Sequence, residues 1–189
     1  MRIGLIRHGE TDWNAQMKLQ GATDIPLNER GVEQAADAGR LLRGSDWTRM
    51  VASPLTRARH TGELIAAELG LDEPELIPNL AERSFGELEG QHVYRPDGSR
   101  TSLEHPSVEP VDAVVERAFE ALTEIATRYP NDNVLALSHG TVIRFVLDQL
   151  LDWQAPHISN VALSVLESDA DSPRGFAVRS ANGYRHYPR

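Results

Sequence analysis

The chain has 189 residues, a formal net charge of −9 and 40% hydrophobic residues, a composition typical of a globular protein of one ordinary domain. It contains no cysteine, which excludes disulfide frameworks, thiolate metal sites and cysteine nucleophiles. The negative charge argues against a nucleic-acid partner. The apolar runs are far shorter than the ~20 residues of a membrane span, and the apolar stretch at the N-terminus is too short for a signal peptide, so we expect a cytoplasmic protein with no membrane partner.

Short apolar runs and helical spacings alternate along the chain. In chain order they predict a strand at 3–6, a helix at 28–42, a strand at 50–52, a helix at 54–69, a minor strand at 76–77, a surface excursion at 86–110, a helix at 111–129, a strand at 134–137, a helix at 142–151 and a hairpin of strands at 161–167 and 176–180. Asn28 is the predicted N-cap of the first helix, and Ser53 and Pro54 are the predicted N-cap and first residue of the second.

This alternation predicts an α/β fold, a three-layer α/β/α sandwich with a largely parallel central sheet. We expect a single domain over 1–189, in which residues 86–110 form a short cap-like excursion.

Basic side chains follow the three best-defined strands. The first strand ends at Arg7 and His8, the second is followed by Arg57, and the third stops at His139. If these strands are neighbours, their carboxyl ends share one edge of the sheet, and the four side chains meet in one crevice. Because arginine forks and free helix N-termini bind oxyanions, the pattern predicts a phosphate site in an otherwise acidic protein.

Five motifs carry these residues, and their order along the chain resembles the histidine phosphatase superfamily, the phosphoglycerate mutase-like proteins. The motifs are Arg7-His8-Gly9-Glu10-Thr11 with Trp13-Asn14, Leu19-Gln20-Gly21 through Asp24-Ile25-Pro26-Leu27, Ser53-Pro54-Leu55-Thr56-Arg57-Ala58, Glu82-Arg83-Ser84-Phe85-Gly86-Glu87-Leu88-Glu89-Gly90, and Ser138-His139-Gly140. Each motif alone is a weak signal, and the ordered set is a strong one.

The resemblance implies chemistry at two of these side chains. His8 is the implied nucleophile, which takes the phosphoryl group on a ring nitrogen, and Glu82 is the implied general acid that protonates the leaving oxygen. The phosphoryl oxygens are implied to be held by Arg7, Arg57, His139 and Asn14.

Further residues have less specific implied roles. Gln20 and Gly21 are expected beside the substrate, and Arg83 is expected either to reach a substrate anion or to pair with an acidic neighbour. No cofactor and no metal are expected, and surface or structural roles are expected for the remaining histidines, which lack metal-ligand spacing (His60, His92, His105, His157 and His186). The acidic stretch Glu82–Glu89 is expected, apart from Glu82, to be a solvated face.

The five motifs leave three functions open. A phosphomonoester hydrolase is favoured, because only 56 residues separate Glu82 from His139, whereas the cofactor-dependent mutases of the family have a longer insertion with extra arginines. Gln20 before Gly21 also resembles the phosphatase branch. A cofactor-dependent phosphoglycerate mutase is the alternative, and a non-catalytic module that binds phosphorylated ligands is the third. The expected partner is a small phosphorylated metabolite, with a homodimer as a further expectation.

Overall fold

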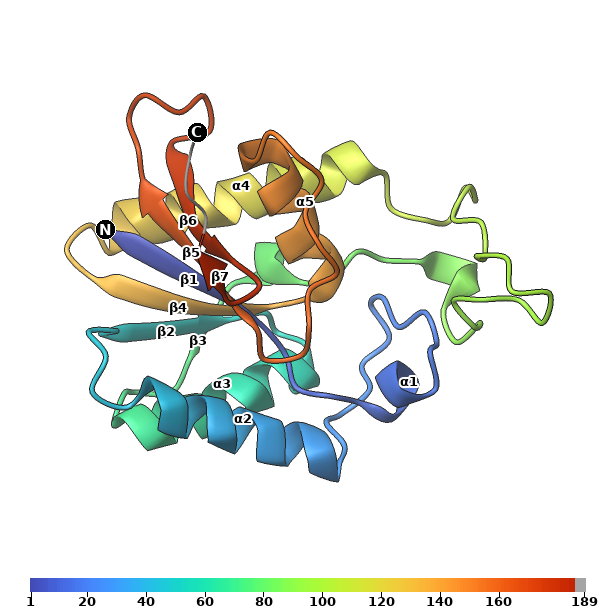
Figure 1. Ribbon diagram of the computed structural model, residues 1–189, viewed down its shortest axis with the longest axis horizontal. Coiled ribbons are helices and arrows are strands. Elements are labelled where there is room, and N and C mark those ends of the chain that lie inside the picture. Colours follow the sequence, from blue (N-terminus) through green and yellow to red (C-terminus); the bar gives the residue numbers. More distant parts are fainter. Residues whose placement is uncertain (186–189) are drawn as a thin grey trace.

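The computed structural model describes residues 1–185, and its centre is a seven-stranded sheet in the order β3-β2-β4-β1-β5-β6-β7 (Figure 1). The strands are β1 (Arg2–Arg7), β2 (Arg49–Ala52), β3 (Glu75–Leu76), β4 (Asn133–Ser138), β5 (Leu163–Ser168), β6 (Phe176–Ala181) and β7 (Tyr184–Arg185). The pairs β3-β2, β2-β4 and β4-β1 are parallel, whereas β5, β6 and β7 continue the sheet antiparallel. The predicted parallel core and the predicted terminal hairpin are both present.

Helices cover both faces of the sheet, which confirms the predicted three layers. Figure 1 shows α2 (Glu29–Leu42) and α3 (Thr56–Leu69) on one face, and α4 (Val111–Arg128) and α5 (Gly140–Leu150) on the other. Three single turns were not predicted: α1 (Asp12–Ala15) and the 3₁₀ turns η1 (Pro78–Leu80) and η2 (Gly86–Leu88). They are too short to show helical periodicity in a sequence.

Each face of the sheet has its own apolar core, because successive side chains of a buried strand point to opposite faces. On β4, Val134 and Ala136 pack in the core beneath α4 and α5, whereas Leu135 and Leu137 pack in the core beneath α3. The continuous apolar run that predicted this strand therefore reflects burial on both faces.

The start of α3 differs from the prediction. The helix begins at Thr56 rather than at Pro54, and Ser53 is not its N-cap. Asp24, from a distant loop, supplies the capping carboxylate: its two oxygens accept from the backbone nitrogen and the hydroxyl of Thr56, at 2.8 and 2.7 Å. Asn28, in contrast, is the N-cap of α2 as predicted, and its side chain accepts from the Gly31 nitrogen at 2.8 Å.

Residues 86–110 extend away from the sheet, on the right of Figure 1, and contain η2 and irregular backbone. They are fastened by a small apolar cluster in which Leu19, Phe85 and Val108 are buried. Leu19 belongs to the segment after β1, so this cluster ties the excursion to the segment that carries the first motif. No helix in the described part of the chain is long and apolar enough to cross a membrane.

Candidate active site

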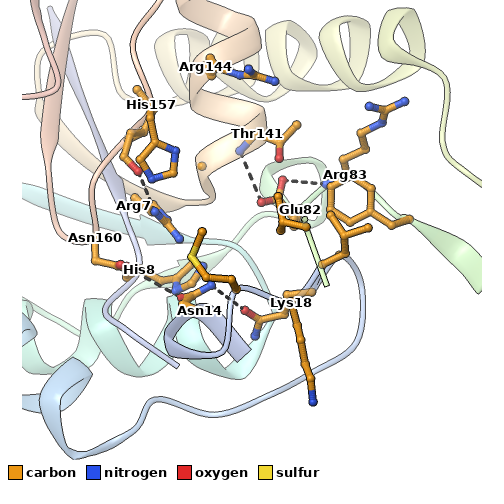
Figure 2. Close-up of a pocket in the computed structure, with 18 of the residues that line it drawn as sticks. Arg7, His8, Asn14, Lys18, Glu82, Arg83, Thr141, Arg144, His157 and Asn160 are labelled. Carbon is orange, nitrogen blue, oxygen red and sulfur yellow. Dashed lines mark hydrogen bonds between the residues drawn. The ribbon is translucent and has the colours of Figure 1, made fainter. Parts of the chain in front are cut away.

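The three strands predicted to carry the basic residues are neighbours, because β4 lies between β1 and β2. A cavity of about 600 Å³ opens at their carboxyl ends. Of the nine residues predicted from sequence, eight line it: Arg7, His8, Asn14, Gln20, Gly21, Arg57, Glu82 and Arg83 (Figure 2 labels five of them). The ninth, His139, is fully buried behind the cavity wall, with its ring 5.2 Å from the ring of His8.

The ring of His8 is held in one orientation and one tautomer. Its Nδ1 lies 2.7 Å from the carbonyl oxygen of Gly9, and because a carbonyl only accepts, Nδ1 carries the hydrogen. Burial, followed by the charges of Arg57 and Arg7, lowers the pKa of His8 well below its usual value. The ring is therefore neutral at physiological pH, and its Nε2 has a free lone pair.

Arg7 and Arg57 are buried cations that are held by neutral groups. Arg57 donates to the carbonyls of Gly21 and Thr23, at 2.7 and 3.0 Å, and Arg7 donates to the carbonyl of Ile158 at 2.7 Å. The Nε atoms of both arginines are buried without a hydrogen-bond partner. Burial lowers the pKa of both guanidinium groups, that of Arg57 to about 10, so both stay charged at neutral pH. Two fixed and incompletely bonded cations beside a neutral imidazole form an oxyanion site.

Glu89 corrects the prediction that the acidic stretch is a solvated face. Its carboxylate accepts from the backbone nitrogens of Ala22, Thr23 and Phe85, at 2.8–2.9 Å, and from the Thr23 hydroxyl. Burial opposes ionisation, but these hydrogen bonds outweigh it and lower the pKa of Glu89. Glu89 thus fixes the loop whose carbonyls hold Arg57.

His139 is neutral and bonded at one nitrogen only. Its Nε2 lies 2.8 Å from the hydroxyl oxygen of Ser53, and its buried Nδ1 has no partner. Burial lowers the pKa of His139 well below its usual value, and the charges of Arg57, His8 and Arg7 add to the effect. The Ser53 hydroxyl, which was predicted as a helix cap, instead orients this ring.

Glu82 lies at the opposite wall of the cavity. One of its oxygens accepts from the backbone nitrogen of Arg83 at 2.9 Å, and the other faces the backbone nitrogen of Thr141, in the first turn of α5, at 3.4 Å (Figure 2). Arg83 does not pair with an acidic neighbour: its Nε donates to the backbone carbonyl of Glu109 at 2.7 Å, while the Glu109 carboxylate is bound by Arg117.

Asn14 and Gln20 form a small polar network in another wall of the cavity. The Gln20 side-chain oxygen accepts from the Thr11 hydroxyl at 3.0 Å and from the Asn14 amide at 3.2 Å. The second amide hydrogen of Asn14 remains available to a ligand. Asn160, which the sequence did not single out, donates to the carbonyl of His8 at 2.9 Å and closes this side (Figure 2).

The structure adds cavity residues that the sequence reasoning missed. His157 lines the cavity, although it was expected in a surface or structural role, and Thr141 and Arg144 line it from α5. The positions of the two α5 residues could have been predicted from the sequence, because they follow the His139 motif within about one helical turn. His157 and Asn160 lie in a connection without regular structure and carried no signal. His186 lies outside the described residues.

Among residues 1–185, no cluster of three or more His, Asp or Glu side chains is placed to bind a metal ion.

The sequence pattern of the histidine phosphatase superfamily (branch 1) matches residues 3–179. The chain belongs to this superfamily. It is 35% identical over 169 residues to the uncharacterized phosphatase PhoE of Bacillus subtilis, a match that covers 87% of both chains. It is 35% identical over 159 residues to a metal-independent phosphoserine phosphatase of Arabidopsis thaliana, with coverage of 76% of this chain and 66% of the relative.

Among solved structures, YhfR of Bacillus stearothermophilus superposes with a TM-score of 0.83 at 25% identity, over 98% of both chains. Other relatives carry phosphoglycerate mutase names. The phosphoglycerate mutase-like fold predicted from the motifs is confirmed, and the chain is an enzyme of the histidine phosphatase family.

Proposed function

We propose that this protein is a metal-independent phosphomonoester hydrolase that acts on a small phosphorylated metabolite through a phosphohistidine on His8. The observation that carries the proposal is the neutral His8 ring, bonded at Nδ1 and free at Nε2, next to two buried arginines with unpartnered Nε atoms. Phosphoryl transfer spreads negative charge over three oxygens, and fixed cations stabilise that charge without reorganisation.

In the first step, the Nε2 lone pair of His8 attacks phosphorus and the P–O bond to the leaving group breaks. Arg7, Arg57, His139 and Asn14 hold the phosphoryl oxygens, the Nδ1 of His139 as a donor. Glu82 gives a proton to the leaving oxygen as the general acid. The products are an alcohol and a phosphohistidine.

In the second step, water attacks the phosphohistidine and the N–P bond breaks. Glu82, now a carboxylate, takes a proton from the attacking water, and inorganic phosphate leaves. The hydrogen bond from Nδ1 to the Gly9 carbonyl keeps the leaving nitrogen aligned in both steps. Gln20 and Gly21 flank the leaving group.

Hydrolysis is proposed over mutase activity because the excursion over the cavity is short. It contributes Val93, Tyr94, Arg100 and Leu103 to the lining and leaves the cavity open on one side, so water reaches the phosphohistidine. A mutase must instead retain its phosphorylated intermediate.

The test is phosphate release from a panel of phosphomonoesters by EDTA-treated protein, with Glu82→Gln as the diagnostic variant. Glu82→Gln is expected to slow alkyl esters, which need a proton on the leaving oxygen, by about 100-fold, and activated aryl esters by much less. Equal slowing of both classes contradicts the acid role. Turnover that appears only with a bisphosphoglycerate primer, as phosphoryl exchange without net phosphate release, contradicts the hydrolase and supports the mutase.

A further inference from the structure

His8, the proposed nucleophile, lies on a short stretch of backbone that belongs to no helix or strand. β1 ends directly before His8, and α1 begins only at Asp12. The backbone nitrogen of His8 extends the sheet by one bond, because it donates to the carbonyl of Ser138 at 3.1 Å. The next peptide group, which joins His8 to Gly9, is bonded by side chains from two other parts of the fold.

Thr61, on α3, binds the nitrogen end of this peptide group. Its hydroxyl oxygen accepts from the backbone nitrogen of Gly9 at 3.0 Å, and its hydroxyl hydrogen is donated to the carbonyl of Arg57, one turn earlier on α3, at 2.7 Å. A hydroxyl has a single hydrogen, so the Thr61 oxygen serves Gly9 only as an acceptor. Because Thr61 is fully buried, water does not compete for either contact. Thr61 thus ties the backbone at His8 to the helical turn that carries Arg57.

Asn160, in the connection before β5, binds the carbonyl end of the same peptide group. Its Nδ2 donates to the carbonyl oxygen of His8 at 2.9 Å and lies 3.4 Å from the side-chain oxygen of Asn14 (Figure 2). The C=O and N–H bonds of a trans peptide point in opposite directions. Thr61 and Asn160 therefore hold the peptide group from its two sides, and together they set its orientation.

The backbone next to Asn160 is strained. Val161 has a φ of 53°, in the left-handed region that a β-branched residue rarely adopts. Its nitrogen donates to the carbonyl of Arg7 at 3.0 Å, which fastens this connection to the end of β1. Strained backbone conformations cluster at functional sites, where the surrounding structure holds them. In this chain the strained residue directly follows the one whose side chain reaches the His8 carbonyl.

The orientation of this peptide group decides where the carbonyl of Gly9 lies, and that carbonyl accepts the Nδ1 hydrogen of His8 at 2.7 Å. Gly9 cannot restrict the rotation itself, because glycine has the widest choice of backbone angles. A larger residue does not fit, since a Cβ at Gly9 would lie 2.4 Å from the carbonyl oxygen of Gly31. The restriction that keeps the Gly9 carbonyl against the His8 ring must therefore come from outside residue 9.

We propose that Thr61 and Asn160 are positioning residues that clamp the His8–Gly9 peptide group, and that this clamp keeps the His8 ring in the tautomer and orientation in which Nε2 attacks phosphorus. The proposal rests on the proposed hydrolase. Both residues act through the peptide group rather than on the phosphorus. Loss of either contact lets the peptide group rotate and the Gly9 carbonyl leave Nδ1, so that the ring hydrogen is shared between the two nitrogens and the nucleophilic form is depleted.

The kinetic test removes each side of the clamp in turn. Thr61→Val, which is nearly isosteric, and Asn160→Ala are each expected to lower kcat/KM about 10- to 100-fold, because misplacement of a reacting group by about 1 Å costs about that much. The inhibition constant of inorganic phosphate is expected to change little, since Arg7 and Arg57 keep their own contacts. Thr61→Ser retains the hydroxyl and is expected to keep most of kcat/KM. Unchanged kcat/KM in both variants, or an equal weakening of phosphate binding, overturns the clamp.

Two comparisons separate the clamp from a general loss of stability. The matched control is Ser164→Ala, because Ser164 is fully buried, its hydroxyl accepts from the backbone nitrogen of Asn182 at 2.9 Å, and it lies outside the cavity lining. It is expected to lower Tm as Thr61→Val does and to leave kcat/KM unchanged. Because Thr61 and Asn160 hold one peptide group, the double variant is expected to lose scarcely more than the larger single loss, whereas independent effects multiply. Multiplied losses, or the same loss of kcat/KM in Ser164→Ala and Thr61→Val, overturn the clamp.

Failure of the hydrolase is distinguishable from failure of the clamp, because the tautomer of His8 is measured without turnover. Nitrogen-15 NMR of protein labelled in its histidines reports which ring nitrogen carries the hydrogen, and the His8 signals are identified by their absence from His8→Ala. At neutral pH the wild-type protein is expected to show only the Nδ1–H form of His8, and Thr61→Val and Asn160→Ala are expected to show the Nε2–H form as well. Mixed tautomers in the variants support the clamp even if no ester is hydrolysed, and an unchanged Nδ1–H form in both variants overturns it.

Discussion

Replacement of Arg117 by methionine tests whether Glu82 is held in place from outside the cavity. Arg117 binds the Glu109 carboxylate through Nε and Nη2, at 2.8 and 3.0 Å, and donates to the carbonyls of Asn79 and Ala81 at 3.0 and 2.6 Å. It therefore fastens the loop that leads into Glu82 to the end of the excursion and to α4.

The cost of Arg117→Met follows from these contacts. Removal of one partner of a buried ion pair costs about 3–5 kcal/mol, and because the two side chains are 18% and 21% exposed, we expect about 2–4 kcal/mol of unfolding free energy to be lost. For a chain of this length that corresponds to a fall in Tm of roughly 6–12 °C. The control is Arg128→Met on the same helix, whose ion pairs with Glu75 and Glu124 are exposed to solvent and contribute little to stability.

The activity readout separates positioning from general stability. Below the Tm of the variant, Arg117→Met is expected to slow alkyl phosphates about 10-fold more than p-nitrophenyl phosphate, because only the alkyl leaving groups need a well-placed Glu82 proton. If Arg117→Met and Arg128→Met lose the same stability, or if both ester classes slow equally in Arg117→Met, the reasoning is refuted.

Three further predictions concern the buried groups around the site. Because the pKa values of His8 and His139 are lowered in the folded state, the unfolded chain binds more protons below pH 6.5, and the free energy of unfolding should fall by about 1 kcal/mol per histidine between pH 7.5 and 5.5. In urea titrations, His139→Gln should reduce this fall by the share of one histidine, and an unchanged fall would contradict the prediction. Ser53→Ala leaves the buried Nε2 of His139 unpaired and should lower kcat about 10-fold with a fall in Tm, so an unaltered kcat would exclude an orienting role. Gly31→Ala places a Cβ 2.1 Å from the Glu10 carbonyl oxygen and should cost about 1–3 kcal/mol, which thermal melts would reveal, whereas an unchanged Tm would show that the backbone yields freely.

The fold was predictable because strands and helices of ordinary length leave clear periodic signals. The apolar runs at 3–6, 50–52 and 134–137 became the three adjacent strands β1, β2 and β4, and the helices on the two faces followed from their spacing. The start of α3 was not predictable, because its capping carboxylate comes from Asp24, which is 32 residues away in the sequence. Local capping rules consider only residues next to the helix start in the sequence and therefore cannot predict such a partner.

The candidate site was predictable where a motif follows a strand. Eight of the nine predicted site residues line the cavity, whereas His157 and Asn160 reach it only because the chain returns to it before β5. Glu89 was misjudged for a related reason: in a sequence it is one of several acidic residues, and only the fold brings three backbone nitrogens around its carboxylate. Long-range contacts of this kind decide which members of a charged stretch are structural.

The most direct test of the central claim is to trap the covalent intermediate. Wild-type protein mixed with a ³²P-labelled ester for milliseconds and quenched in alkali should carry a label that is stable to base and labile to acid, as a phosphoramidate is, and peptide mass spectrometry should locate it on His8. His8→Ala should carry no label and release no phosphate. Steady turnover without a labelled enzyme, or a label on a different residue, would contradict the assignment of His8 as the nucleophile.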